Sequence, residues 1–223
     1  MALNIAMDGP VGAGKSTIAD EVAKRLDMMH LDTGAMYRAV GLTALRREID
    51  VADEEAVTKM CEEITMEVVY GPQGQRVLIN GLDVTGGLYT EEVSMAASKV
   101  ATYGGVRKAM VATQQRMAAT TDMLVDGRDI GTRVLPNATV KIFLTADAEE
   151  RARRRYDQLK QKGVDADFHA VLADLKKRDE QDMNRAIDPL KAAPDAVIVD
   201  STGLSFEETV ESIVELVKER AHG

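Results

Sequence analysis

The chain has 223 residues, of which 45% are hydrophobic and 29% charged, a balance typical of globular proteins that bury a core. The formal net charge of −9 excludes nucleic-acid binding by bulk electrostatic attraction, and no apolar run is long enough to span a bilayer. The single cysteine, Cys61, cannot form an internal disulfide. We therefore expect a cytoplasmic protein that contacts neither nucleic acid nor membrane.

The first predicted element is a short buried strand, LNIAMD (3–8), followed by a glycine-rich turn and a helix from Lys15. The turn GPVGAGKS (9–16) matches the P-loop pattern G-x-x-x-x-G-K-[ST]. Glycines let backbone N–H groups surround a phosphate, the lysine reaches the β and γ phosphates, and the serine hydroxyl can ligate Mg²⁺. We predict that a nucleoside triphosphate binds here, with Ser16 as the metal ligand. The predicted binding residues are Gly9, Pro10, Val11, Gly12, Ala13, Gly14, Lys15, Ser16 and Thr17.

A second strand is predicted at 28–32, and a helix follows from Thr33 to about Arg47. In LDTGAMYR (31–38) the polar residues Asp32 and Thr33 stand at the helix start, and Arg38 lies just over one turn inside. Such a helix start can bind another phosphate or a base edge. An ordinary helix cap beside a solvated arginine would have the same pattern.

The pattern changes after a further helix at 53–63. Short apolar runs alternate with turn residues, and Asn-Gly at 80–81 joins two of them, which is the strongest short-range indication of a hairpin. We predict a small three-stranded antiparallel meander that interrupts an α/β chain as an insert. Its strands are MEVVY (66–70), RVLI (76–79) and LDVT (82–85), and helical sequence resumes over 91–119.

Buried strands and helices alternate in the second half of the chain. Short apolar strands separated by helices predict a parallel sheet covered on both faces. The predicted strands lie at 122–126, 140–145 and 196–200. The predicted helices start near Asp147, cover 167–185, and follow a capping box of Ser205 and Glu208.

Several basic residues in 126–185 form candidate anion sites. Arg128 and Asp129 directly follow a buried strand, where ligands bind in open α/β sheets, although a loop salt bridge is the alternative. Arg178, Asp182 and Arg185 are spaced i, i+4 and i+7, so they share one helix face. That row could bind sugar hydroxyls and phosphates, or it could be a surface ion-pair ladder.

The run RARRR (151–155) places Arg151, Arg154 and Arg155 on one helix face, next to a predicted mobile loop. The alternative is a solvated basic face. Residues 126–185 nearly balance acidic and basic side chains, whereas the rest of the chain is acidic. Anionic substrates are therefore expected to meet this segment and the P-loop.

Taken together, these stretches resemble the bacterial cytidylate kinases through nearly the whole chain. The resemblance rests on IAMDGPVGAGKST, LDTGAMYR, the hairpin insert, AASKVA, VDGRDIGT, KIFLTADAEERARRR and RDEQDMNRA, in this order. It implies an α/β P-loop NTPase fold with a five-stranded parallel sheet flanked by helices, a small antiparallel β insert in the monophosphate-binding region, and a helical lid. It also implies a single kinase domain over 1–223. The core would be 1–33, 106–150 and 186–223, the monophosphate-binding region 34–105, and the lid with its adjoining helix 151–185.

The resemblance further implies ATP- and Mg²⁺-dependent phosphoryl transfer to CMP or dCMP by a monomer. The implied catalytic residues are Lys15, Arg38, Arg128, Arg154 and Arg185. Arg38 and Arg128 would bind the acceptor phosphate, and Arg154 would reach the transferring phosphates. The cytosine would contact Thr33, Arg107, Asp129 and Arg185, the ribose would contact Ser98, Arg178 and Asp182, and Asp32 would complete the substrate site. Thr33 stands where many relatives have serine, which keeps the hydroxyl.

Two other functions remain open at this point. One is a kinase for another small acceptor, such as UMP, AMP or a sugar acid. The other is a P-loop switch or motor ATPase, with Asp126 as its metal-coordinating carboxylate, although a guanine-reading [NT]-K-x-D motif does not occur. An acceptor phosphate is largely dianionic at neutral pH and needs no general base. His30, outside any motif, is accordingly predicted to pack or lie at the surface.

Overall fold

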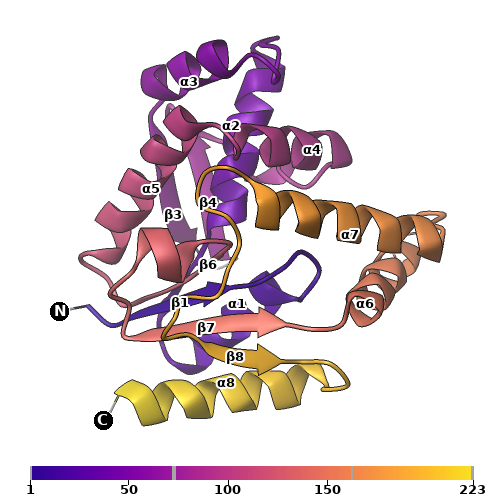
Figure 1. The fold of residues 1–223 in the computed structure, drawn as a ribbon. Helices are drawn as coiled ribbons and strands as arrows, with labels where there is room; N and C mark the ends of the chain where they lie inside the picture. The colour runs from indigo at the N-terminus through magenta and orange to yellow at the C-terminus, as the bar shows by residue number, and fades with distance from the viewer. Residues whose placement is uncertain (1, 72–73, 162, 222–223) are drawn as a thin grey trace. The chain divides into compact units, whose positions relative to one another are not determined.

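The computed structural model describes residues 2–71, 74–161 and 163–221. The chain divides into two compact units, residues 1–30 with 120–223, and residues 31–119 (Figure 1). Within the described part of the chain, no helix has both the length and the apolar character needed to cross a membrane.

The larger sheet is parallel and five-stranded, in the order β2-β6-β1-β7-β8. Its strands are β1 (Asn4–Asp8), β2 (Met29–Asp32), β6 (Met123–Gly127), β7 (Val140–Thr145) and β8 (Val197–Asp200). β1 lies between β6 and β7, with Ile5 opposite both Leu124 and Val140. Strands buried on both faces are continuous apolar runs, which is why the sequence reveals them. All five predicted strands are confirmed to within one or two residues.

Among the residues that the structure describes, the first unit has four helices and one short helical segment. They are α1 (Lys15–Arg25), η2 (Ile130–Val134), α6 (Ala148–Gln161), α7 (Phe168–Asn184) and α8 (Phe206–Ala221). The predicted capping box of α8 is confirmed: Glu208 N donates to Ser205 Oγ at 3.2 Å, and Ser205 N donates to the Glu208 carboxylate at 2.8 Å. Asp167 caps α7 by accepting from Ala170 N at 2.8 Å. α6 and α7 pack against each other.

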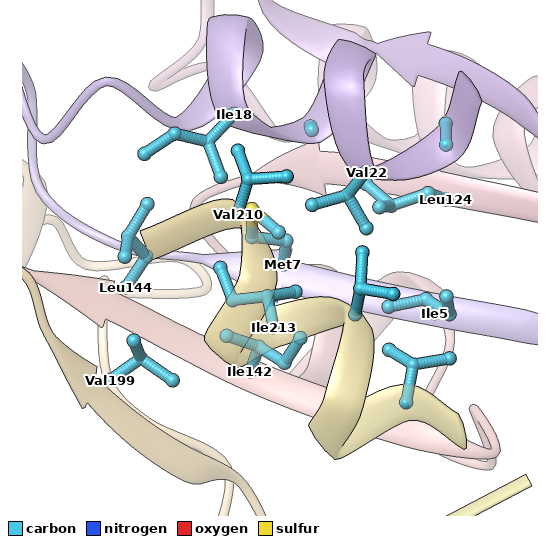
Figure 2. Packing of buried hydrophobic residues seen from close by; sticks show 14 of the residues in the cluster. Ile5, Met7, Ile18, Val22, Leu124, Ile142, Leu144, Val199, Val210 and Ile213 are labelled. Atoms are coloured by element: carbon cyan, nitrogen blue, oxygen red, sulfur yellow. The ribbon is translucent and has the colours of Figure 1, made fainter. Parts of the chain in front are cut away.

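The core of this unit lies between the sheet and helices α1 and α8. Figure 2 shows Ile18 of α1 and Val210 of α8 converging over the strands. Met7 of β1, Ile142 of β7 and Ile213 of α8 are each at most 1% exposed. Both β1 and α1 are therefore held from the core side, which fixes the two ends of the P-loop between them.

The second unit contains the predicted meander. Its strands are β3 (Met66–Gly71), β4 (Gly74–Ile79) and β5 (Leu82–Asp83), paired in that order. Asn80 and Gly81 have φ angles of 50° and 78°, as a type I′ hairpin turn requires. The hairpin prediction is confirmed because its determinants are adjacent in sequence.

The helices of the second unit are α2 (Thr33–Arg46), α3 (Glu54–Glu63), η1 (Thr85–Gly87), α4 (Glu91–Val100) and α5 (Gly104–Ala118). The helical sequence expected over 91–119 forms two helices, α4 and α5, which are separated by residues 101–103. Gly104 and Gly105 are poor helix formers, and Tyr103 at the break donates to Val51 O at 2.7 Å. A Cβ on Gly105 would lie 2.2 Å from Thr58 Cγ2, so the close packing of α5 on α3 requires a glycine at this position.

Candidate active site

The P-loop runs from the end of β1 to the start of α1, and its glycines are sterically required. Gly9 has a φ angle of 153°, and a Cβ there would lie 2.0 Å from the carbonyl oxygen of Leu144 on β7. Gly14 precedes α1 with a φ of 81°, in the left-handed region. Ser16 and Thr17 follow in the first turn of α1, where both are exposed. This geometry suits backbone N–H groups that surround a phosphate at a helix N-terminus.

Lys15 lies inside this loop with only 6% of its surface exposed. Its ammonium group donates to Pro10 O at 2.7 Å. Burial, followed by repulsion from Arg128, lowers the pKa of Lys15 to about 7, against the attraction of Asp126 and Asp8. An anionic phosphate would offset both effects, because it stabilises the charged form.

Asp8 at the end of β1 is a buried carboxylate that anchors the start of the P-loop by hydrogen bonds. Its two oxygens accept from Ile130 N at 2.7 Å and Gly131 N at 2.8 Å. Burial raises the pKa of Asp8 to about 6, although the two N–H donors act in the opposite direction. The carboxylate therefore connects the P-loop to η2 at a cost in ionisation free energy.

Ser16, Asp126 and His30 form a hydrogen-bonded chain beside the loop. Ser16 Oγ donates to Asp126 Oδ2 at 2.9 Å, and His30 Nε2 lies 2.7 Å from Asp126 Oδ1. Burial alone would raise the pKa of Asp126, but the His30 hydrogen bond and charge, Lys15 and Ser16 hold it below its usual range. A hydroxyl and an ionised carboxylate are the oxygen donors that Mg²⁺ prefers, so these side chains fit that ion.

Arg151 of α6 and Asp179 of α7 both bind the main chain of the P-loop at Val11. Arg151 Nη1 donates to Val11 O at 2.8 Å, and Val11 N donates to Asp179 Oδ1 at 3.3 Å. The two side chains form an ion pair at 2.7 Å and are only 7% and 11% exposed. Arg151 therefore does not belong to a solvated basic face, whereas Arg155 on the same helix is exposed.

The structure brings four of the predicted acceptor-site residues together in pairs. Arg128 Nε donates to Asp182 Oδ2 at 2.8 Å, and Arg185 Nη2 donates to Asp129 Oδ1 at 3.0 Å. The second pair is almost fully buried, with both side chains 7% exposed. Two acidic side chains thus hold two arginines at the carboxyl end of β6, where ligands bind in open α/β sheets.

Of the predicted row, Arg178 and Asp182 lie within α7, whereas Arg185 follows the last helical residue, Asn184. Arg185 is the residue that ends α7, and its extended backbone (φ −62°, ψ 142°) does not continue the helix. Arg178 pairs with Asp174 one turn earlier on α7, at 2.9 Å. The i, i+4, i+7 spacing presumed a helix one residue longer than α7.

Arg154 of α6 is bound to the loop after β8. Its guanidinium donates to Ser201 Oγ at 3.1 Å and to Ser201 O at 2.8 Å, and it pairs with Glu150 at 3.1 Å. These three contacts, all within the first unit, hold the Arg154 side chain in a defined orientation.

The second unit carries the other predicted site residues. Asp32 caps α2 by accepting from Ala35 N at 3.1 Å, and its other oxygen lies 3.6 Å from Arg38 Nη1. Thr33 is the first residue of α2 and is 4% exposed. The Arg38 guanidinium lies 5.2 Å from the ring centroid of Tyr89. Asp32 therefore both caps α2 and lies close to Arg38, so the cap and the arginine belong to one side-chain cluster.

Ser98 and Arg107 lie on different helices of the second unit. Ser98 is half-buried on α4. Arg107 on α5 is 2% exposed, donates to Ala101 O at 3.3 Å and lies 5.9 Å from the ring centroid of Tyr37. A buried arginine held against an aromatic ring keeps a fixed orientation.

Residues 5–219 match the family model described as "Cytidylate kinase". The chain belongs to the cytidylate kinase family. The cytidylate kinase of Shouchella clausii is 47% identical over 98% of this chain and 97% of its own length. That of Caldicellulosiruptor bescii is 48% identical over 96% and 95%, and that of Bacillus subtilis is 42% identical over 98% of both chains.

Among solved structures, an uncharacterized protein from Eubacterium ventriosum matches with a TM-score of 0.55 at 10% identity, over 97% of this chain and 98% of that one. This likeness concerns the fold alone. It supports the α/β arrangement of this cytidylate kinase family member.

Sequence reasoning missed several residues that shape the site of this family member. His30 was assigned to packing or surface, but it contacts Asp126. The motifs do not include Asp8 or Asp179, although Asp8 is recognisable in sequence as a carboxylate that ends a buried strand directly before the P-loop. Asp179 lies next to the motif residue Arg178, yet only the folded chain brings it to Val11.

Proposed function

We propose that this chain transfers the γ-phosphoryl group of ATP to CMP or dCMP, giving ADP and CDP or dCDP. The observation that carries the proposal is the family match over residues 5–219, which includes a P-loop with the required backbone conformation. Kinases for other acceptors and switch ATPases are not favoured by any relative named above.

The nucleophile in this reaction is an oxygen of the acceptor phosphate. It forms a bond to the γ-phosphorus of ATP while the bond from that phosphorus to the β–γ bridging oxygen breaks, and ADP leaves. A monophosphate is largely dianionic at neutral pH, so no general base has to remove a proton. The protein's task is to bring two anions into line and to stabilise the charge that moves between them.

Lys15 and the P-loop backbone would hold the β and γ phosphates of ATP. The lowered pKa of Lys15 is consistent with this role, because a buried amine gains its strongest stabilisation from an anion. Mg²⁺, when bound, neutralises and orients the phosphate oxygens, and Ser16 with Asp126 would hold it. The Arg151–Asp179 pair would keep the loop tip in place.

Arg38 and Arg128 would bind the acceptor phosphate, each arginine being presented by an aspartate, Asp32 or Asp182. We assign cytosine recognition to Thr33, Arg107, Asp129 and Arg185, and ribose contacts to Ser98, Arg178 and Asp182, with Asp32 completing the substrate set. The buried Asp129–Arg185 pair supports this assignment, because a base edge needs fixed donors and acceptors.

The segment 151–185 would act as a lid over ATP, next to a core of 1–33, 106–150 and 186–223 and a monophosphate-binding region of 34–105. In this role Arg154 would exchange its contacts to Ser201 for oxygens of the transferring phosphate. Closure would exclude water, which is the competing nucleophile. We also propose a monomer that acts in the cytoplasm without nucleic acid, in keeping with the acidic composition and the single free cysteine.

The test is phosphoryl transfer from ATP with Mg²⁺ to CMP, dCMP, UMP, AMP, GMP and dTMP. We expect strong turnover with CMP and dCMP and little with the others. Turnover with a different monophosphate would keep the kinase chemistry but contradict the cytosine assignments. Hydrolysis of ATP without transfer to any acceptor would contradict the proposed function.

A further inference from the structure

The insert, residues 64–90, contacts the start of α2 through the side chain of Gln75. Gln75 Oε1 accepts from Asp32 N at 2.8 Å, and Gln75 Nε2 donates to Asp32 O at 3.1 Å. One side-chain amide thus satisfies both main-chain polar groups of a single residue, as a neighbouring strand would. The contact joins positions 43 residues apart within the second unit.

Asp32 transmits this contact to the rest of the cluster. Its Oδ1 caps α2 at Ala35 N, and its Oδ2 lies 3.6 Å from Arg38 Nη1. The space is tight, because a Cβ on Gly34 would lie 2.9 Å from Asp32 Oδ1 and 3.2 Å from Arg38 Nη1. A shift of the Asp32 main chain would therefore move the helix cap and the partner of Arg38 together.

The insert also supplies a second contact to the same arginine. Tyr89 places its ring centroid 5.2 Å from the Arg38 guanidinium carbon, a cation–π distance. Arg38 thus lies between the Asp32 carboxylate and the aromatic ring of Tyr89. The insert holds the first group through Gln75 and supplies the second itself.

We propose that Gln75 and Tyr89 are positioning residues for acceptor binding, and that the insert holds Asp32 and Arg38 in the arrangement that receives the acceptor phosphate. This inference rests on the proposed function of Arg38. Neither residue needs to touch the substrate. The role differs from general stabilisation of the fold, because it predicts an effect on the acceptor and not on ATP.

The test compares Gln75→Ala, Tyr89→Ala and Tyr89→Phe with wild type. Arg76→Ala is the matched control, because Arg76 is the next residue on β4 and pairs with Asp83 at 2.7 Å with half of its side chain exposed. Steady-state KM values for CMP and ATP, the Kd of CMP by calorimetry, and the hydrogen exchange of the Asp32 amide are measured on each protein.

Gln75→Ala is expected to weaken CMP binding by on the order of tenfold, since it removes two hydrogen bonds, and to speed exchange of the Asp32 amide. The KM for ATP stays at the wild-type value. Tyr89→Ala is expected to weaken CMP binding by about two- to fivefold. Tyr89→Phe keeps the aromatic face, so its affinity for CMP should equal that of wild type. Arg76→Ala changes neither KM.

A Gln75→Ala protein that binds CMP as tightly as wild type overturns the inference, whatever its activity. Equal increases in KM for CMP and ATP also overturn it, because they indicate a general loss of structure. If the wild type binds CMP but does not phosphorylate it, the proposed function fails, while the Kd comparison still decides the role of Gln75.

Discussion

Lys15 illustrates how a residue can be unfavourable for stability and favourable for ligand binding. Its ammonium group is buried beside Arg128, and its pKa falls to about 7. In the folded protein the charged form of Lys15 therefore lacks the hydration that it has in the unfolded chain. The oxygens of a triphosphate would replace that hydration, so part of the folding cost becomes binding free energy.

Replacing Lys15 with Ala is expected to lower kcat/KM for CMP phosphorylation by at least about a hundredfold, because the variant loses a preorganised charge at the transferring phosphate. Lys24→Ala is the matched control, since Lys24 is on the same helix with 78% of its side chain exposed. A coupled assay of ADP formation gives kcat/KM for each of the two variants. Wild-type activity in Lys15→Ala would contradict the assignment of the loop.

Asp8 should make stability depend on pH in the acidic range. The folded protein keeps the Asp8 proton up to a pKa of about 6, whereas the unfolded chain loses it near 3.8. In this range unfolding releases a proton, so the free energy of unfolding falls as pH rises from below 4 to above 6, by up to about 3 kcal/mol in total. Well above pH 6 both states are ionised and this contribution disappears.

The measurement is urea unfolding of wild type and Asp8→Asn between pH 4 and 8. Asn does not titrate, so the stability of wild type relative to the variant should decrease from pH 4 through pH 6 and level off only well above pH 6. A difference that is the same at every pH would show that Asp8 ionises normally.

At the scale of elements, α6 and α7 hold the P-loop through one buried ion pair. Arg151 and Asp179 each bind a main-chain group of Val11 and also bind each other. Leu175 of α7 and the main chain of Arg151 also lie against Gly12, where a Cβ would be 3.3 Å from Leu175 Cδ2. Helices that are distant in sequence thus determine the shape of a loop that looks self-contained.

Arg151→Met should lower the free energy of unfolding by roughly 3–5 kcal/mol, because it leaves the Asp179 carboxylate buried without its partner. The double variant Arg151→Met/Asp179→Leu should recover part of that loss, since both charges are gone. Arg155→Met, an exposed arginine on the same helix, should stay within about 0.5 kcal/mol of wild type. Chemical denaturation measures all three, and a double variant less stable than Arg151→Met would contradict the pairing.

The elements that sequence alone predicts well are those whose determinants are local. The Asn80–Gly81 turn, the Ser205–Glu208 capping box and the apolar run of β1 each lie within a few residues, and all are confirmed. The division of 91–119 into α4 and α5 was not predicted, although the two adjacent glycines, Gly104 and Gly105, stand at the start of α5.

The candidate site divides in the same way. The P-loop is a local pattern, and the arginine at 128 follows from its place after a buried strand. The bond from Ile130 N to Asp8 joins residues 122 positions apart, and no sequence period encodes it. The sequence also did not predict that Arg128 pairs with Asp182, because Asp182 was expected to lie in a row with Arg178 and Arg185.

At the scale of the whole molecule, the proposed substrates should stabilise the protein by mass action. A ligand at a hundred times its Kd adds about 2.7 kcal/mol to the free energy of unfolding, which raises the Tm of a chain of this size by roughly 5–10 °C. CMP alone should produce this shift, and GMP at the same concentration should not. Equal shifts with both would contradict cytosine recognition.

The contacts of the P-loop have a consequence for how the chain is made. The loop is complete in sequence after residue 16, but Asp8 needs Ile130, Ser16 needs Asp126, and Val11 needs a partner 168 positions further on. On a ribosome the motif emerges early and stays without its supports until α7 has been synthesised. Domains fold as units, so an N-terminal fragment that ends before α6 would carry the whole motif and still lack a formed phosphate site. Nascent chains of increasing length should therefore acquire nucleotide binding in one late step, once Asp179 has emerged.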